Sequence, residues 1–445
     1  MPRFTEEQGI RWLYAHLPSL VANGVLDPQS AERLRAHFGE PLDRPRRPYA
    51  IIVFAVLGAI LVALGIMLVL AHNWEFLSRP ARAAISIGGL LASQAAAAWA
   101  MLRRPQSLAW REGAAAFLMI MIGASIVLVG QTYHIPGDPS TFLLTWMLLA
   151  LPMVYLLDAV VPAVLYLAGI LMWAGDLNRN SAYQVWAWPL CALIVPYWVF
   201  TIRQRPDGPR AAVLSLALCV SLFFTALITS EERLPGLWII TFSMLFGVLY
   251  LIGARRREHR AHRWQAPFLL LGSLGIGVLA IVLTFEHPWD DIGWRHVNGV
   301  DDYVSAVAEP AVAAMLIAGV VILLADACKR SAWRTLYFGV MPILAIAAYG
   351  ITSLIETPTI AQILFNVYVA TVGLAMIVRG LQTENLGKLN GGLLMAGILI
   401  ACRFFETELP FIVRGLGFIL IGTGFLSANL IMLRRRNRPR ESMIP

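Results

Sequence analysis

Charged residues are scarce in this chain. Only 14% of its 445 residues are Asp, Glu, Lys or Arg, whereas 58% are hydrophobic, and the mean hydropathy is +0.68. A soluble domain carries about 25% charged and 45–50% apolar residues. The excess of apolar side chains excludes a single soluble core and indicates that lipid is the solvent for most of the chain.

Patterns typical of zinc, disulfide and nucleotide sites are lacking as well. The four cysteines lie in or beside apolar segments without a CxxC pair, and no Walker A sequence occurs. The net charge of +8 would suggest nucleic acid in a soluble protein, but the positive-inside rule explains it in a membrane protein. We therefore expect no cofactor and no nucleic-acid partner, and membrane lipids as the immediate surroundings.

Residues 1–49 are polar and have no apolar stretch typical of a signal peptide, so we expect none to be cleaved. They predict a small cytosolic helical hairpin, in which Asn23-Gly24 forms the turn and Asp27-Pro28 starts the second helix. So short a segment buries little apolar surface. We expect it to contact the membrane surface or a protein partner.

Residues 50–433 predict an all-α, polytopic membrane domain with about 14 transmembrane helices, although any number from 12 to 14 fits the pattern. A basic cytosolic tail, 434–445, follows. Around Asp158, the residues Pro152 and Pro162 indicate either a tight turn or a broken helix. The predicted spans are 50–71, 83–102, 113–130, 141–157, 159–174, 185–202, 211–229, 236–253, 268–285, 310–327, 335–354, 359–378, 390–402 and 411–433.

The arginines decide the orientation of these spans. With the N-terminus inside, 28 of the 35 Lys and Arg residues fall in inner regions. Basic loops stay in the cytosol, so we expect both termini inside (N-in/C-in) and a location in a bacterial inner membrane. The seven basic residues left outside are Arg79, Arg82, Arg179, Arg233, Arg295, Arg403 and Arg414.

A dense polar cluster, 130–139, interrupts two apolar helices at the predicted outer face. It is either a fixed turn built on its glycine and prolines or a ligand-binding site. The candidate ligand-binding residues are Gln131, Tyr133, His134 and Asp138. Because His134 and Asp138 can both transfer protons, an envelope enzyme is one further hypothesis, although no catalytic residue is assigned.

The run 128–157, a Gly-Gln-x-Tyr-His cluster followed by an apolar helix with Trp and then Leu151-Pro152, resembles the DUF2157 family of predicted bacterial membrane proteins. The hairpin with Gly24-Val25-Leu26, and Asn73-Trp74 after the first span, fit the same family. The resemblance covers about residues 6–175, and the second half carries no matching motif. The family has no assigned activity, so the resemblance implies a membrane protein and supplies no catalytic residues.

The longest outer loop, 286–309, contains His287, Asp290 and Asp291, with His296 and Asp301-Asp302 further on. Imidazole and carboxylate groups suit zinc or manganese, but the ligands lack a regular spacing. An acidic, solvated loop explains the pattern equally well. We assign no metal site to this loop.

The polar residues placed deepest in the predicted spans are Gln94, Gln362 and Asn366, which can form hydrogen bonds between helices. No charged residue falls at the expected bilayer centre, where one costs about 2.5–3.5 kcal/mol. This argues against ion-coupled transport and intramembrane proteolysis. We therefore predict a non-enzymatic membrane protein, a scaffold or a protein that handles a lipid or envelope precursor. The alternative is a secondary transporter or flippase whose path passes Gln94, Gln362 or Asn366.

Overall fold

The computed structural model describes residues 6–38, 77–176, 184–230, 236–255, 262–290, 292, 303–330, 333–355 and 357–406, with isolated positions at 54–68 and 419–427. These residues are helical almost throughout and contain no strand. The prediction of an all-α protein is confirmed for them.

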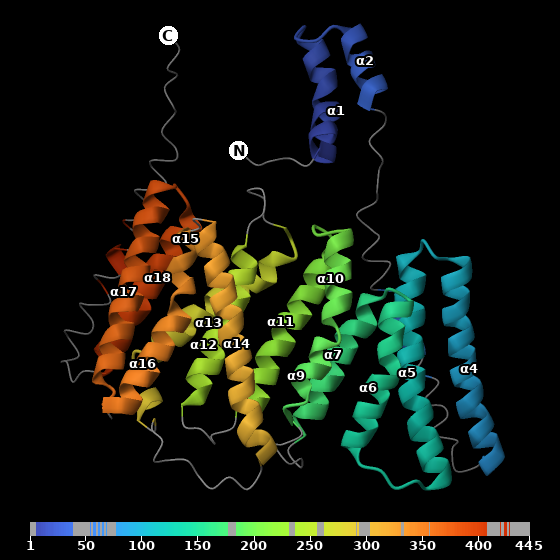
Figure 1. Cartoon of the computed structure of the whole chain (residues 1–445). Helices are drawn as coiled ribbons and strands as arrows, with labels where there is room; N and C mark the ends of the chain where they lie inside the picture. Colours follow the sequence, from blue (N-terminus) through green and yellow to red (C-terminus); the bar gives the residue numbers. More distant parts are fainter. Residues whose placement is uncertain are drawn as a thin grey trace.

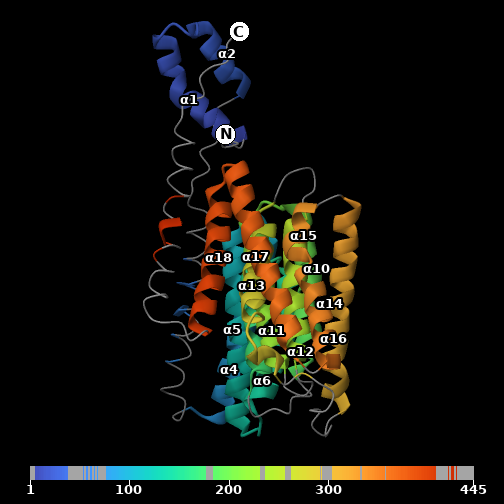
Figure 2. The same ribbon diagram turned by 90° about the vertical axis from the view of Figure 1, so that its left-hand side faces the viewer.

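Most of the helices run side by side in one bundle, as two views at right angles show (Figures 1 and 2). The bundle is formed by α4 (Arg79–Arg103), α5 (Leu108–Tyr133), α6 (Pro139–Leu156), α7 (Val160–Ala174), α9 (Ala187–Ala192), α10 (Val195–Gln204), α11 (Pro209–Thr229), α12 (Leu237–Ala254), α13 (Gln265–Val282), α14 (Tyr303–Lys329), α15 (Trp333–Gly339), α16 (Met341–Ile355), α17 (Thr359–Gln382) and α18 (Leu386–Glu406), with a short 3₁₀ helix, η2 (His287–Trp289), after α13.

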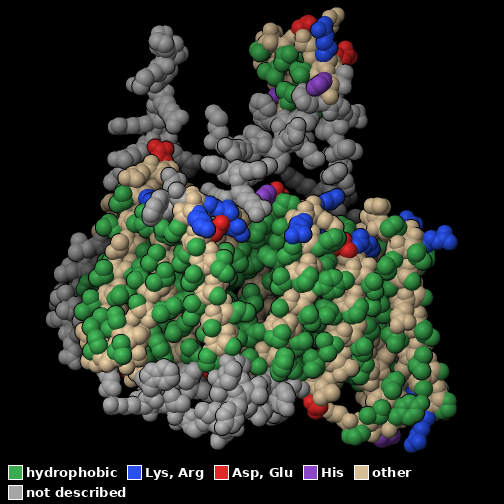
Figure 3. Space-filling model, viewed as in Figure 1, with side chains coloured by type: hydrophobic (Ala, Val, Ile, Leu, Met, Phe, Trp, Pro, Cys, Tyr) green, Lys and Arg blue, Asp and Glu red, His purple; other side chains and the backbone are tan. Residues whose placement is uncertain are grey.

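The bundle has two chemically different ends. The connections 104–107, 157–159, 205–208 and 383–385 all lie at the upper end in Figure 1. We call this the basic end, because Lys and Arg side chains gather along its rim (Figure 3). The far end carries the connection 134–138. The alternation of basic loops read from the sequence is therefore present in the fold of the described residues.

Ten described segments are long and apolar enough to cross a membrane, and α7 is a shorter apolar helix. Together with the pair α9 and α10, they correspond to twelve of the fourteen predicted spans. The first and last predicted spans, 50–71 and 411–433, lie almost wholly outside the described residues. The chain is thus a multi-pass membrane protein, and the total of fourteen spans stays a prediction.

Two predicted spans are discontinuous. The segment 185–202 consists of α9 and α10, and 335–354 consists of α15 and α16. Pro196 and Pro342 each stand at the start of the second helix, where the missing N–H breaks the hydrogen-bond ladder. At Asp158, by contrast, the chain makes a tight turn between α6 and α7, with φ of 46° at this residue.

Glycine lets several helices pack backbone against backbone. A Cβ at Gly272 of α13 would lie 2.3 Å from the backbone nitrogen of Tyr250, and one at Gly253 of α12 would lie 2.3 Å from that of Leu269. A Cβ at Gly392 of α18 would lie 2.7 Å from the carbonyl oxygen of Gly373. Small residues at such contacts bring helices together in lipid.

The buried side chains form three clusters. One holds α4 and α5 together, a second lies among α5, α6, α7, α9, α10 and α11, and the third lies among α11 to α18. Helix α11 contributes Leu214 and Leu218 to the second cluster and Cys219 and Ala226 to the third. Helix α11 therefore joins the two halves of the bundle, together with α9, whose Trp188 lies in the third cluster and Cys191 in the second.

The N-terminal residues form a hairpin of α1 (Glu6–Ala22) and α2 (Pro28–Phe38). Gly24 takes the left-handed conformation in the turn, with φ of 69°, and the Asp27 carbonyl accepts a 3.1 Å bond from Ala31 N. Leu17 and Ala31 are buried. Figures 1 and 2 both place the hairpin beyond the basic end of the bundle.

Candidate functional site

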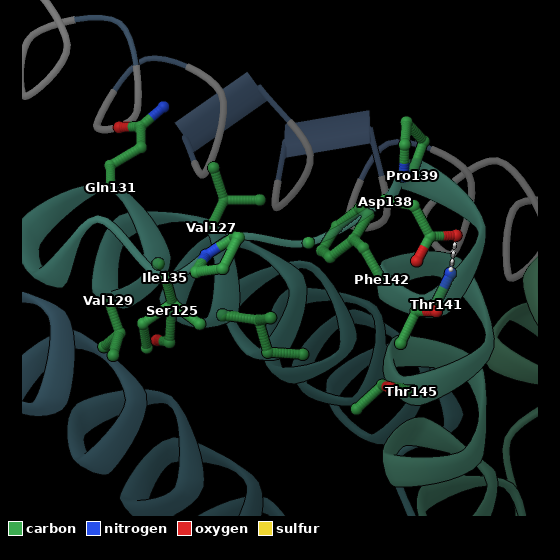
Figure 4. A pocket seen from close by; sticks show the side chains of 14 residues that line it. Ser125, Val127, Val129, Gln131, Ile135, Asp138, Pro139, Thr141, Phe142 and Thr145 are labelled. Atoms are coloured by element: carbon green, nitrogen blue, oxygen red, sulfur yellow. Dashed lines mark hydrogen bonds between the residues drawn. The ribbon is translucent and has the colours of Figure 1, made fainter.

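A cavity of about 780 Å³ lies between α5 and α6 toward the far end of the bundle (Figure 4). Apolar side chains make up most of its wall, and polar groups come from both helices and from the connection between them. The residues that line it are Ser125, Ile126, Val127, Val129, Gly130, Gln131, Ile135, Pro136, Gly137, Asp138, Pro139, Thr141, Phe142 and Thr145.

The connection between α5 and α6 is fixed by its own hydrogen bonds. His134 ends α5 in the left-handed conformation, with φ of 52°, and its N–H donates to the Gly130 carbonyl. The N–H of Ile135 donates to the same oxygen at 3.0 Å. Pro139 then opens α6 at a position that needs no N–H. The mouth of the cavity is therefore built on a rigid turn.

The four candidate residues of this region divide into two pairs. Gln131 and Asp138 line the cavity, and Figure 4 shows them at opposite ends of the view. Tyr133 and His134 are exposed and are not part of the lining. The Asp138 carboxylate accepts a 3.0 Å hydrogen bond from the backbone N–H of Thr141, which makes it the N-cap of α6. The cavity is thus lined by two of the four predicted residues, which lie on opposite sides of it.

Beyond the lining of the cavity, toward the basic end, α5 and α6 are in close contact. A Cβ at Gly123 would lie 2.5 Å from the Trp146 ring, so the indole rests directly on the backbone of α5. Its Nε1–H donates to the Met119 carbonyl at 2.7 Å. Ser125 is turned toward α4, where its hydroxyl donates to the Ser86 carbonyl at 3.1 Å. At this depth the lining is mostly hydrocarbon, with the hydroxyl groups of Ser125 and Thr145 as its polar groups.

The three deep polar candidates lie elsewhere. Gln94 is on an exposed face of α4. Asn366 Nδ2 donates to the carbonyls of Gln362, at 2.8 Å, and Thr284, at 3.5 Å. Arg403 Nη2 also donates to the Thr284 carbonyl, at 3.0 Å. Asn366 thus contributes to a hydrogen-bonded cluster at the far end of α13, α17 and α18, and none of the three candidates lines the cavity between α5 and α6.

A cluster of charged residues at the basic end was not predicted as a unit. Glu112, the fifth residue of α5, is buried, and its Oε1 and Oε2 accept hydrogen bonds of 2.9 and 2.8 Å from the backbone N–H groups of Val160 and Val161. These N–H groups begin α7 and have no partner inside that helix. A carboxylate at this place satisfies them and complements the helix dipole.

Two arginines and a tyrosine complete this cluster. Arg111 Nη2 lies 2.8 Å from Asp158 Oδ2, and Arg210 Nη2 lies 3.1 Å from Asp158 Oδ1. Arg210 Nε lies 3.7 Å from Glu112 Oε1. The Tyr197 hydroxyl donates to Asp158 Oδ1 at 3.2 Å. The cluster links α5, the α6–α7 turn, α10 and α11, and two carboxylates balance two guanidinium groups. The sequence pattern around Asp158 indicated a turn or a broken helix, and nothing in it pointed to Glu112.

At the break between α9 and α10, side-chain hydroxyl groups add hydrogen bonds to backbone carbonyls, among them that of Leu190, which also accepts from the N–H of Leu193 at 3.2 Å. The Tyr166 hydroxyl donates to the Leu190 carbonyl at 3.1 Å, and the Tyr155 hydroxyl donates to the Leu193 carbonyl. Unsatisfied backbone groups are costly in lipid. Two tyrosines on α6 and α7 therefore stabilise this discontinuous helix.

Among the described residues, no group of three or more His, Cys, Asp or Glu side chains is placed to hold a metal ion. In the acidic loop, His287 Nδ1 lies 3.4 Å from Asp290 Oδ2. The other residues named for this loop, Asp291, His296, Asp301 and Asp302, lie outside the described part of the chain.

Residues 18–163 match the model of a family described as predicted membrane proteins, DUF2157. The matched region includes the cavity between α5 and α6 and both acidic residues of the cluster at the basic end, and it agrees with the resemblance stated from the sequence. No curated protein and no solved structure matches the chain.

Proposed function

Because residues 18–163 match a family of predicted membrane proteins and contain the cavity between α5 and α6, we propose that this protein binds an amphipathic lipid in that cavity. The lipid is a membrane lipid or an envelope precursor with a polar headgroup and a long hydrocarbon chain. The binding is non-enzymatic, and the protein resides in a bacterial inner membrane.

The observation that carries the proposal is the order of polar and apolar groups along the cavity. Gln131 and Asp138 line it at the far end, where α5 ends and α6 begins, and Val127, Val129 and Phe142 line it further toward the basic end. Ser125 and Thr145 add hydroxyl groups there, and that of Ser125 is bonded to α4. A membrane lipid has the same order, since its headgroup lies at the surface and its chains lie in the hydrocarbon core. The small number of polar groups suits a site that orients one headgroup.

The charge distribution supports an orientation with the basic end in the cytosol. Arg79, Arg82 and Arg403 belong to the far end, where Figure 3 shows a small basic group below α4. The basic end carries many more, among them Arg103, Arg104, Arg203, Arg205, Arg255, Arg263, Lys329 and Arg330. In this orientation the cavity opens toward the outer leaflet, and both termini are cytosolic.

The positions and hydrogen bonds of the ionisable residues near the cavity agree with a non-enzymatic role. The Asp138 carboxylate caps α6, and His134 is exposed outside the cavity lining. A general acid–base pair has to reach the same reacting atom. Mass spectrometry of lipid recovered from vesicles that contain the full chain tests this role. A covalently altered lipid that is no longer formed by a His134→Ala, Asp138→Ala double variant would contradict it, and unaltered lipid with both proteins would support it.

The test fills the cavity and leaves the rest of the bundle unchanged. Thr145→Trp places an indole in the cavity wall, and Thr371→Trp, at an exposed position of α17, is the matched control. We expect Thr145→Trp to weaken binding of polyprenyl phosphate or phosphatidylglycerol about tenfold, or about 1.4 kcal/mol. Native mass spectrometry of the full chain measures the bound lipid. Equal binding by the two variants would contradict the proposal.

A secondary transporter or flippase is the second candidate. The discontinuous pair α9 and α10 favours it, since broken helices form substrate sites in many transporters. The expected readout is movement of a fluorescent phospholipid between the leaflets of proteoliposomes that contain the full chain. Transport that is lost in Gln362→Ala and Asn366→Ala supports this candidate, and the absence of transport by the unaltered chain rejects it.

A further inference from the structure

A second cavity, of about 790 Å³, lies among α11, α12 and α13 in the other half of the bundle. We call it the aromatic groove. Its lining contains no charged residue and only one hydroxyl group. The residues that line it are Cys219, Val220, Phe223, Phe224, Leu227, Ser230, Trp238, Phe242, Phe246, Leu249, Leu271, Leu274, Gly275, Val278, Leu279 and Val282.

The groove begins beyond an aromatic contact that holds α10, α11 and α13 together at the basic end. There the rings of Trp198 and Trp264 have their centroids 5.5 Å apart, as do those of Trp198 and Phe268. Trp264 N also donates to the carbonyl of Pro206 at 3.4 Å, just before α11. From Cys219 and Leu271 onward, the groove runs between α11 and α13 toward the far end.

Phenylalanine rings make one wall of the groove rigid. The centroid of Phe223 lies 6.0 Å from those of Phe242 and Phe246, and the last two are 6.1 Å apart. A Cβ at Gly275 would lie 2.2 Å from the Phe246 ring, so this ring rests on the backbone of α13. Rings packed in this way keep their positions, and the groove is therefore preformed.

The length and depth of the groove match one leaflet of a membrane. From Cys219 to Ser230, α11 rises about 16 Å at 1.5 Å per residue. Half of a hydrocarbon core is about 15 Å thick. Val220, Phe224, Leu274 and Val278 are exposed along this length, so the groove opens sideways toward the surrounding lipid.

Ser230, Cys219 and Trp238 are the lining residues with a polar side-chain atom, and Trp238 stands at the start of α12, at the far end of the groove. The Ser230 hydroxyl, at the far end, donates to the Ala226 carbonyl at 2.6 Å. The Cys219 thiol, at the deep end, is buried. The groove lies at the depth of the hydrocarbon core, and its apolar walls are open to contact with lipid chains.

We propose that the aromatic groove binds one acyl chain of a phospholipid from the leaflet at the far end. The methyl end of the chain lies beside Cys219 and Leu271, and its carbonyl end lies near Ser230 and Val282. The site is separate from the cavity between α5 and α6 and does not depend on the function proposed for it. A fixed groove that contacts the chain from three helices orders it more than the bulk bilayer does, which makes the lipid a bound component.

The test uses two photoactivatable phospholipids. Phosphatidylethanolamine with a diazirine near the methyl end of one chain, or near its carbonyl end, is diluted into phosphatidylethanolamine and phosphatidylglycerol vesicles that contain the full chain. Mass spectrometry then locates the labelled peptides. We expect the methyl-end probe to label residues 219–223 and 271–274, and the carbonyl-end probe to label residues 227–230 and 278–282.

A matched pair of variants tests occupancy of the groove. Leu274 and Leu374 are similarly exposed, at 59% and 62%, but only Leu274 lines the groove. We expect Leu274→Trp to lower labelling of the groove about fivefold, since the indole displaces the chain, and Leu374→Trp to leave it unchanged. If Leu274→Trp does not fold, Val278→Phe fills the same groove with a smaller ring.

Two results would overturn the proposal. They are labelling that shows no order with probe depth, and labelling that Leu274→Trp and Val278→Phe leave unchanged. The Thr145→Trp variant separates this site from the proposed function, because it fills the other cavity and is expected to retain full labelling of the groove.

Discussion

The Glu112 carboxylate accepts a 2.9 Å hydrogen bond from the backbone N–H of Val160, 48 residues further along the chain. The bond ties the beginning of α5 to the beginning of α7. Helix α7 has 15 residues, or about 22 Å at 1.5 Å per residue, which is shorter than a hydrocarbon core of about 30 Å. Its first turn is therefore buried, and its free N–H groups depend on Glu112.

Replacing Glu112 should destabilise the bundle. In Glu112→Gln, one of the two N–H groups at the start of α7 faces an amide N–H, and Arg210 loses one of its two carboxylates. Breaking a buried ion pair costs about 3–5 kcal/mol. We expect a clearly lower thermal unfolding midpoint in detergent. Glu32→Gln, at an exposed position of α2, should leave the midpoint unchanged, and a similar loss in both variants would contradict this role.

Two glycines of α13 should respond differently to a methyl group. At Gly272, a Cβ would lie 2.3 Å from the Tyr250 nitrogen, whereas at Gly277 nothing lies within 4 Å. We expect Gly272→Ala to separate α12 from α13 and to destabilise the protein by about 1–3 kcal/mol, as overpacking does. Gly277→Ala should be neutral or slightly stabilising. Chemical denaturation in micelles measures both, and equal effects would argue against the backbone contact.

The tyrosines at the helix break should contribute to stability through their hydroxyl groups. Tyr166→Phe leaves the Leu190 carbonyl without its side-chain donor inside the bundle. Interhelical hydrogen bonds in membranes contribute about 0.6–2 kcal/mol. We expect a loss of this size, whereas Tyr133→Phe, at an exposed position, should have no effect. Amide hydrogen exchange around residues 190–195 should also accelerate in Tyr166→Phe only.

A native cysteine reports the orientation of the bundle. Cys328 is exposed near the basic end of α14, whereas Cys191 and Cys219 are buried. In a Cys402→Ser background, we expect a membrane-impermeant maleimide to label Cys328 only after the cells are permeabilised, because the orientation that we propose places the basic end in the cytosol. Labelling of Cys328 to the same extent in intact cells would mean that the basic end faces outward, which would contradict the proposed orientation.

The class of fold was predictable because apolar runs and arginines repeat along the whole chain. Twelve predicted spans coincide with described helices or helix pairs, since lipid requires every backbone group in a span to be satisfied by helical hydrogen bonds. The breaks at 193–194 and 340 were missed. Their signals, Pro196 and Pro342, are present in the sequence, but a proline near the start of a helix and one that breaks a helix look alike.

The candidate site was predictable only in part. The turn around Gly137 has strong local signals, which is why Asp138 could be named as a candidate residue, whereas its role as the N-cap of α6 is known from the structure. The cavity wall comes from Val127, Phe142 and their neighbours, and apolar residues of this kind occur in every span. Glu112 gave no signal, because its partners Val160 and Val161 are contacted through backbone atoms that every sequence contains.

The closely packed helix pairs have a consequence for biogenesis. Helices α4 and α5, α6 and α7, α12 and α13, and α17 and α18 pack against each other pairwise, and each pair is connected at the basic end. With that end in the cytosol, a pair can leave the translocon as a preassembled unit after its second helix is synthesised. Only the far-end loops then have to be translocated across the membrane, and the arginines between paired helices stay on the cytosolic side.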